Sequence, residues 1–115
     1  MFNFFNRKAD PFEVTPADLK QRQAAGEQLY ILDVREPAEY ADGHIAGSKL
    51  IPLGQLANRI SGLPQDRPIV AVCRSGNRSS VAQGVLKRAG FTNVLNLRGG
   101  MLAWARSGLP VKRGK

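Results

Sequence analysis

The stretch Pro68–Ser80, "PIVAVCRSGNRSS", decides the fold and contains the only cysteine of the chain. Its first five residues form a continuous apolar run, which is typical of a strand that is buried on both faces of a sheet. Cys73 follows this run directly, in a polar loop with Arg74 and Arg78, and a helical pattern begins after Ser80. This order indicates an α/β fold with Cys73 at the carboxyl end of a strand, where ligands bind in open sheets.

Strand and helix patterns alternate on both sides of this stretch. Strands are expected in the apolar runs at residues 11–14, 28–34, 48–52, 67–72 and 92–97. Helices are expected at residues 15–25, 37–41, 53–62, 81–90 and 99–108, the first with Thr15 as its N-cap. The core positions expected in the last two helices are Val81, Val85, Leu86, Leu102 and Trp104. Repeated strand–helix–strand units predict a mostly parallel five-stranded sheet with helices on both faces.

The composition is that of a soluble globular protein with one domain. The chain has 115 residues, of which 43% are hydrophobic and 23% charged, and this length is sufficient for a hydrophobic core. We predict a domain at residues 11–111, between an N-terminal tail at 1–10 and a loose C-terminal tail at 112–115.

The N-terminal tail, "MFNFFNRKAD", has its positive charges after the aromatic residues, which is the reverse of a secretory signal. We therefore expect a cytoplasmic protein. No run approaches the roughly 18 apolar residues of a membrane span, so no stable membrane association is expected. Phe2, Phe4 and Phe5 are interpreted as part of a frayed or folded-back tail, and a weak surface anchor or partner contact is the alternative.

The counts of cysteine, histidine and charged residues exclude several kinds of site. One cysteine cannot form an intramolecular disulfide, and Cys73 with the single histidine, His44, cannot supply the three or four ligands of a zinc site. All nine acidic residues lie between Asp10 and Asp66, so the basic excess falls in the second half. Basic residues there are spread singly among few aromatic residues, which disfavours nucleic acid; a solvated basic face and the attraction of a small anion stay as interpretations.

The loop after Cys73 has the features of an anion site. Its backbone N–H groups can converge on one point beside a helix N-terminus, Gly76 permits the tight curvature, and Ser79 is the expected N-cap. Arg74 and Arg78 add positive charge. Such surroundings lower a cysteine pKa to roughly 3.5–7.5, so we expect a partly exposed, nucleophilic thiolate. The alternative, a small buried core cysteine, is disfavoured by its polar neighbours.

Three motifs resemble the signatures of single-domain rhodaneses, which are thiosulfate sulfurtransferase-type modules. They are "LDVREPAEYADGHIAGSKLIP" (Leu32–Pro52), "VCRSGNRSS" (Val72–Ser80) and "LRGGMLAWARSGLPV" (Leu97–Val111). The resemblance covers about residues 11–111 in the expected order and implies the three-layer rhodanese-like fold. Ser48 and Leu50 depart from the usual Ala and Asn, at positions that concern loop packing and not the chemistry.

The resemblance implies sulfur transfer in two steps. Cys73 would attack the outer sulfur of thiosulfate or a similar small anionic donor, and the persulfide would pass its sulfur to cyanide, a thiol or an acceptor protein. It implies no metal or organic cofactor. Arg74 would meet the substrate charge at the mouth of the site, and Arg78 would close the loop and help to hold the anion. The residues expected to bind the substrate are Arg74, Ser75, Gly76, Asn77, Arg78 and Ser79.

The length of the loop separates two uses of this architecture. Related phosphatases and arsenate reductases carry Cys-x5-Arg, whereas this chain has Cys73-x4-Arg78, which narrows the cradle to about one sulfur atom and favours sulfur over phosphate. Three alternatives stay open: phosphatase or arsenate reductase activity on the same fold, a non-enzymatic persulfide carrier or redox-sensing module, and, least favoured, a nucleic-acid-binding protein.

Several residues outside the loop have supporting interpretations. Asp33 and Arg35 are expected to form an ion pair that braces the site, with direct substrate contact by Arg35 as the alternative. His44 is expected to make a structural hydrogen bond, and Gly99-Gly100 to let the last strand–helix turn pass close to the loop. Glu36 and Glu39 are expected to be solvated or to pair locally.

Overall fold

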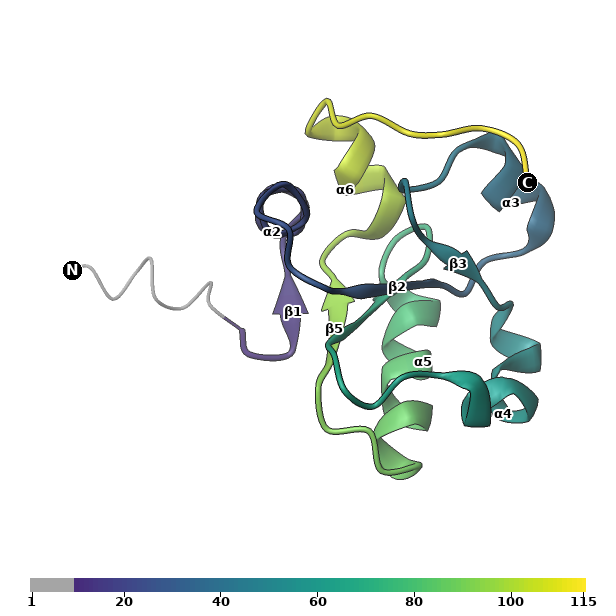
Figure 1. The fold of residues 1–115 in the computed structure, drawn as a ribbon. Coiled ribbons are helices and arrows are strands. Elements are labelled where there is room, and N and C mark those ends of the chain that lie inside the picture. Colours follow the sequence, from purple (N-terminus) through teal and green to yellow (C-terminus); the bar gives the residue numbers. More distant parts are fainter. Residues whose placement is uncertain (1–9) are drawn as a thin grey trace.

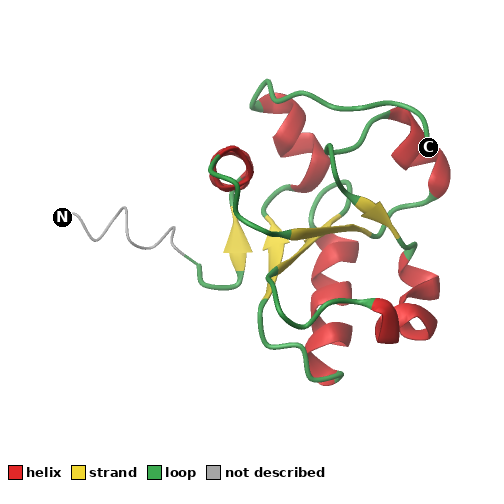
Figure 2. Ribbon diagram, viewed as in Figure 1, coloured by secondary structure: helices red, strands yellow, loops and turns green. Residues whose placement is uncertain are grey.

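The structure, a computed structural model, describes residues 10–115 and contains one sheet of five parallel strands (Figures 1 and 2). The strands are β1 (Glu13–Val14), β2 (Tyr30–Asp33), β3 (Lys49–Leu50), β4 (Ile69–Val72) and β5 (Val94–Leu97). Their order across the sheet is β1-β5-β4-β2-β3, and every paired neighbour is parallel. The predicted mostly parallel, five-stranded sheet is confirmed. The prediction for the N-terminal phenylalanines lies outside the described residues.

Strand β4 lies at the centre of the sheet because its side chains are apolar on both faces. Ile69 and Ala71 pack on one side and Val70 and Val72 on the other, and all four are buried. Cys73 follows β4 directly, between the carboxyl ends of its neighbours β2 and β5. The continuous apolar run therefore places the cysteine at the centre of the ligand-binding edge.

The helices form an outer layer on each face of the sheet. They are α2 (Pro16–Ala24), α3 (Pro37–Asp42), α4 (Leu56–Arg59), α5 (Asn77–Arg88) and α6 (Gly100–Arg106). Helices α4 and α5 cover one face of the sheet, and α2 and α6 cover the other (Figure 1). Their buried side chains join the core on each face. Thr15 caps α2 as predicted: its hydroxyl accepts a hydrogen bond from the Asp18 N–H at 3.1 Å. No helix of residues 10–115 is long and apolar enough to cross a membrane.

Two predicted core positions are wrong. Val81 is 55% exposed, because α5 buries Ser79, Ala82 and Leu86 instead. Leu102 is 39% exposed, whereas its neighbour Met101 is buried with Trp104. The predicted helix at 53–62 also differs, because two short 3₁₀ turns flank the four residues of α4. These differences alter which side chains are exposed and leave the order of the elements unchanged.

The C-terminal segment is attached to the domain and not loose as predicted. The backbones of His44 and Lys112 exchange two hydrogen bonds of 2.9 and 2.8 Å, and the Gly114 N–H donates to Ala41 at 2.8 Å. The segment thus runs alongside α3 and the turn that follows it (Figure 1). Trp104 helps to shape this path, since its indole N–H donates to the carbonyl of Pro110 at 2.9 Å.

Candidate active site

The loop after β4 passes directly into α5, which begins at Asn77. Gly76 is the N-cap residue in the left-handed region, with φ +106°, a conformation that glycine adopts without strain. The prediction that Ser79 caps the helix is therefore wrong: Ser79 lies in the first turn and is fully buried. Arg74, Ser75 and Asn77 are exposed on the outside of the loop.

The Cys73 sulfur lies inside the curve of this loop and is a hydrogen-bond acceptor. The Gly76 N–H donates to Sγ at 3.1 Å, and the Ser79 hydroxyl donates to Sγ at 3.3 Å. The side chain is fully buried, so the predicted partial exposure is wrong: the loop and α5 enclose the sulfur.

Burial and hydrogen bonding act in opposite directions on the Cys73 thiol, and together they lower its pKa. Burial is the largest influence and opposes ionisation, but the hydrogen bonds together outweigh it. They come from the Ser79 hydroxyl and from the N–H groups of Ser79, Gly76 and Ser75. The sequence predicted a lowered pKa from backbone N–H groups, a helix N-terminus and the two arginines together, and the structure assigns the effect to the neutral donors around the sulfur.

Asn96 on β5 forms hydrogen bonds with the Cys73 loop and with the first turn of α5. It was not predicted from the sequence as a site residue. Its side-chain amide donates to the Gly76 carbonyl at 3.1 Å, and its Oδ1 accepts a hydrogen bond from the Ser79 hydroxyl at 2.6 Å. The hydroxyl has one proton, so it can donate to Asn96 or to the Cys73 sulfur at any moment. The sequence did contain a signal for Asn96. It follows the buried Val94 by two positions, and alternate residues of a strand share one face, so a polar residue is expected on a buried face there.

Gly100 brings the last strand–helix turn against the Cys73 loop, as predicted for the Gly99-Gly100 pair. The N–H groups of Met101 and Leu102 donate to the carbonyls of Cys73 and Arg74 at 2.9 and 3.0 Å. A Cβ atom on Gly100 would lie 2.4 Å from the Cys73 carbonyl oxygen, and φ is +58°. Only glycine fits this contact without displacing the loop.

Arg78 points to Glu39 on α3 and forms a two-pronged ion pair with it. The guanidinium nitrogens lie 2.7 and 2.8 Å from the two carboxylate oxygens. Hydrogen bonds from Arg78 lower the pKa of Glu39 to about 2, and those to Glu39 raise the pKa of Arg78. Glu39 also accepts the Glu36 N–H at 3.0 Å, so the expected local contact is present but is not its principal one.

Asp33 and Arg35 form the predicted ion pair, and both side chains are buried. The Arg35 Nε lies 2.9 Å from one carboxylate oxygen of Asp33, and the terminal nitrogen lies 2.8 Å from the other. The same nitrogen donates to the Gly43 carbonyl at 2.8 Å, which ties the end of α3 to β2. His44 makes the expected structural hydrogen bond, from Nδ1 to the Tyr40 carbonyl at 2.8 Å.

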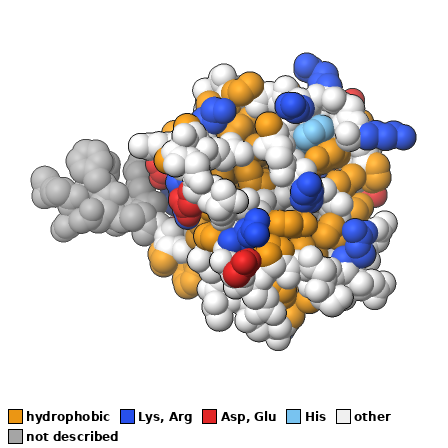
Figure 3. All heavy atoms as spheres, viewed as in Figure 1, with side chains coloured by type: hydrophobic (Ala, Val, Ile, Leu, Met, Phe, Trp, Pro, Cys, Tyr) orange, Lys and Arg blue, Asp and Glu red, His pale blue; other side chains and the backbone are white. Residues whose placement is uncertain are grey.

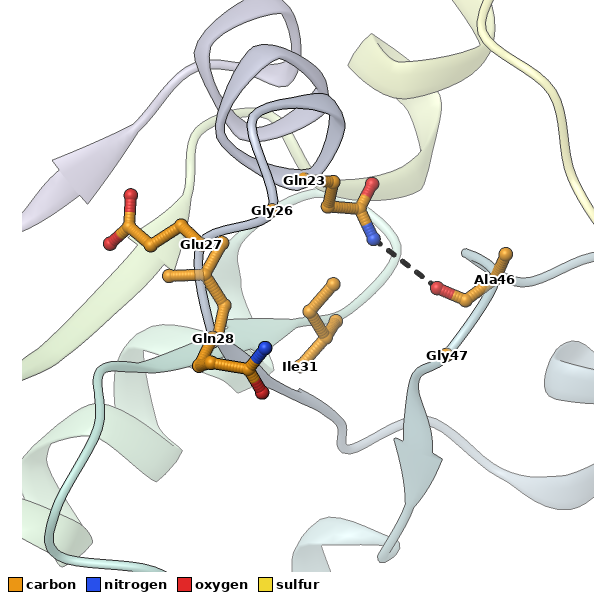
Figure 4. Close-up of a pocket in the computed structure, with 8 residues that line it drawn as sticks. Gln23, Gly26, Glu27, Gln28, Ile31, Ala46 and Gly47 are labelled. Carbon is orange, nitrogen blue, oxygen red and sulfur yellow. Dashed lines mark hydrogen bonds between the residues drawn. The ribbon is translucent and has the colours of Figure 1, made fainter.

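A groove of about 240 Å³ borders the Cys73 loop and is lined by Arg35, Glu39, Asp42, Arg74, Met101 and Leu102. A second pocket, of about 270 Å³, lies where β2 begins, between residues 26–29 and Ala46-Gly47 (Figure 4). The Gln23 amide crosses it to the Ala46 carbonyl at 3.3 Å. Since parallel strands begin at the opposite edge from Cys73, this second pocket lies away from the sulfur.

The surface and the described side chains add two observations. Lys and Arg side chains are spread over the face in Figure 3 and do not form one continuous patch. Among residues 10–115, no group of three or more His, Cys, Asp and Glu side chains is placed to hold a metal ion.

Comparison with known proteins matches residues 15–107 to the family model described as Rhodanese-like domain. A protein named sulfurtransferase from Allochromatium vinosum is 44% identical over 99 residues, which are 86% of this chain and 92% of that protein. A protein named HTH-type transcriptional regulator from Mycobacterium tuberculosis is 41% identical over 102 residues, and the chain spans 45% of its length. Among solved structures, a rhodanese-related protein from Thermoplasma volcanium has a TM-score of 0.80 at 35% identity, covering 87% of this chain and 96% of that chain.

Proposed function

Because the chain belongs to the rhodanese-like family, we propose that it transfers a sulfane sulfur through a persulfide on Cys73. The donor is thiosulfate or a similar small anion, and the acceptor is cyanide or a thiol. One observation carries the proposal: the only thiol of the chain lies in a ring of neutral donors that lowers its pKa at the carboxyl end of the central strand.

In the first step, the Cys73 thiolate attacks the outer sulfur of thiosulfate. The bond between Sγ and that sulfur forms while the sulfur–sulfur bond of thiosulfate breaks, and its electron pair leaves with sulfite. Negative charge then moves to the outer sulfur of the persulfide. The N–H groups of residues 74–78 are the donors available to stabilise it, and exposed Arg74 is available to attract the donor anion.

The geometry also supports a second candidate, a persulfide carrier or redox-sensing module. The same hydrogen bonds to Cys73 can stabilise a persulfide whether its sulfur is then passed to a small thiol or to a protein. A similar domain forms part of a larger protein named as a transcriptional regulator. In this case Cys73 would still accept sulfur, but it would pass the sulfur on only to one protein.

The test is intact mass after incubation with thiosulfate, followed by turnover with cyanide. We expect the wild-type protein to gain the mass of one sulfur atom and to form thiocyanate, and Cys73→Ser to do neither. A wild-type mass that stays constant contradicts both candidates. A mass gain without turnover favours the carrier. Faster turnover of a phosphate ester or arsenate than of thiosulfate contradicts the argument from loop length.

A further inference from the structure

The Ser79 hydroxyl lies between two hydrogen-bond acceptors and has one proton to share between them. Its Oγ is 3.3 Å from the Cys73 sulfur and 2.6 Å from Oδ1 of Asn96. Within residues 10–115 these are its two acceptors. A hydroxyl has a single proton to donate, so a hydrogen bond given to the sulfur is one withdrawn from Asn96.

The amide of Asn96 is held with its oxygen towards Ser79. Its Nδ2 donates to the Gly76 carbonyl at 3.1 Å, so a flipped amide would place two oxygen acceptors against each other. The side chain is buried, and Ser79 is the one donor to Oδ1 among the described residues. Oδ1 is therefore left without a partner whenever the hydroxyl turns to the sulfur, and an unpaired buried acceptor costs free energy.

The charge on the Cys73 sulfur determines which acceptor receives the hydrogen bond. A thiolate accepts a charge-assisted hydrogen bond, which is stronger than a neutral one. In a thiol the sulfur is uncharged, and in a persulfide the charge moves to the outer sulfur, so Sγ becomes a weak acceptor in both. An amide oxygen at 2.6 Å is then the better partner. The hydroxyl therefore favours Sγ in the free thiolate and Asn96 in the thiol and persulfide forms.

We propose that Asn96 is a positioning residue that competes with the Cys73 sulfur for the Ser79 hydrogen bond and so favours the sulfur-loaded form of the protein. The hydroxyl rotates between its two acceptors as Sγ gains and loses charge. No covalent bond forms or breaks in this rotation, and the proton stays on Ser79. The inference rests on the proposed function, since the loaded form is the Cys73 persulfide.

The contact between Asn96 and Gly76 acts in the opposite direction. The Gly76 N–H donates to Sγ at 3.1 Å, and the Gly76 carbonyl accepts from Asn96, so the amide also helps to hold this donor in place. Loss of that support disfavours the thiolate, whereas loss of the competition for the Ser79 hydroxyl favours it. The two roles of Asn96 therefore have opposite signs, and an experiment can separate them.

The experiment is a double-mutant cycle of Asn96→Leu and Ser79→Ala. Leucine has the branched shape of asparagine but neither its donor nor its acceptor. The pH dependence of alkylation by iodoacetamide gives the ionisation constant of the only thiol in each protein. Without the Ser79 hydroxyl, Asn96→Leu reports only the support of Gly76. The difference between the two backgrounds therefore isolates the competition for the hydrogen bond.

The charged side chains that border the loop stay unchanged in all four proteins. They belong to the loop itself (Arg74, Arg78), to α3 (Glu39, Asp42) and to the segment after β2 (Arg35). Their influence on the thiol is therefore subtracted by the cycle. Asn93→Leu makes the same substitution at an exposed position just before β5, and as the matched control it should leave the ionisation constant unchanged.

We expect Asn96→Leu to favour ionisation roughly two- to ten-fold more when Ser79 is present than in the Ser79→Ala protein, the factor that corresponds to one hydrogen bond. Equal effects in the two backgrounds would show that Asn96 only supports the loop. A coupling of the opposite sign would show that it directs the hydroxyl towards the sulfur. Either result overturns the proposal. If Asn96→Leu does not fold, Asn96→Ala removes the same groups without adding apolar volume.

A second measurement follows the loaded form at a pH at which the thiol is ionised. Protein is equilibrated with thiosulfate and sulfite, and intact mass gives the ratio of persulfide to free protein. Asn96→Leu should lower this ratio roughly two- to ten-fold more in the presence of Ser79 than in the Ser79→Ala protein, and equal changes contradict the proposal. If thiosulfate does not load Cys73, the proposed function fails, while the ionisation constants still test the competition between Asn96 and the sulfur.

Discussion

Strands β2 and β4 are neighbours, and each ends in a buried acidic group that is held in a different way. Asp33, the last residue of β2, is neutralised by Arg35 two positions later. Arg35 also donates a hydrogen bond to the Gly43 carbonyl. Cys73, directly after β4, is held by N–H groups and a hydroxyl. The arginine of its own loop, Arg78, is engaged by Glu39.

The difference separates a structural anion from a reactive one. A carboxylate paired with a buried guanidinium has both of its charges fixed, and removing either leaves the other uncompensated. Neutral donors around a sulfur stabilise its charge without binding a counter-ion to it, so the sulfur keeps its lone pairs available for attack. Two adjacent positions on one sheet edge thus serve stability and chemistry separately.

The largest expected effect is on stability, from breaking the Asp33–Arg35 pair. We expect Asp33→Asn to lower the free energy of unfolding by about 3–5 kcal/mol, because the Arg35 charge stays buried without a partner. Urea unfolding measures this. Asp66→Asn, at an exposed pair, is the control and should change stability by less than about 1 kcal/mol. A loss for Asp33→Asn as small as that of the control would show that the buried pair does not fix the end of β2.

The second effect concerns the thiol. Ser79→Ala removes a donor from the Cys73 sulfur, so we expect the pKa of the thiol to rise. Since ionised thiol is the reactive form, alkylation by iodoacetamide below both pKa values should slow by roughly two- to ten-fold, the factor that corresponds to the loss of one hydrogen bond. The pH dependence of the alkylation rate measures the shift. Ser80→Ala, the exposed neighbour, is the control, and an equal shift in both variants would contradict the assignment to the Ser79 hydroxyl.

The smallest expected effect is on stability, from removing the ion pair between Arg78 and Glu39. We expect Glu39→Gln to lower the free energy of unfolding by about 0.5–1 kcal/mol at neutral pH. The pKa of Glu39 is lowered from 4.5 to about 2, so the stability from the pair is present above pH 4.5 and is lost as the pH falls towards 2. Unfolding at pH 2 to 7 measures the difference between the two proteins. A difference that stays constant down to pH 2 would show that ionised Glu39 is not its source.

The sequence was sufficient for the order of elements because each strand and helix carries a local pattern. The central strand, the N-cap at Thr15 and the close approach of Gly100 follow from apolar runs and from residues with special backbone preferences. Local patterns were less reliable for helix faces. In α5, Val81 is the more apolar residue, but the geometry of the Cys73 loop buries Ala82 and polar Ser79.

The contacts that tune the site could not be predicted because they join distant parts of the chain. The Arg78–Glu39 pair spans 39 positions, and the Ser79–Asn96 hydrogen bond spans 17. A sequence shows two arginines beside a cysteine, and only the fold reveals that one of them faces a carboxylate on α3. The count of loop residues, by contrast, was visible from the start.

The contacts of Asn96 and Gly100 also set the order in which the chain can become reactive during its synthesis. Proteins are made from the N-terminus, and Cys73 emerges before the residues that complete its surroundings. Until Asn96 holds the Gly76 carbonyl, and Met101 and Leu102 bond to the loop, the ring of donors lacks these contacts. We therefore expect the surroundings of the thiol to be complete only when β5 and α6 are in place.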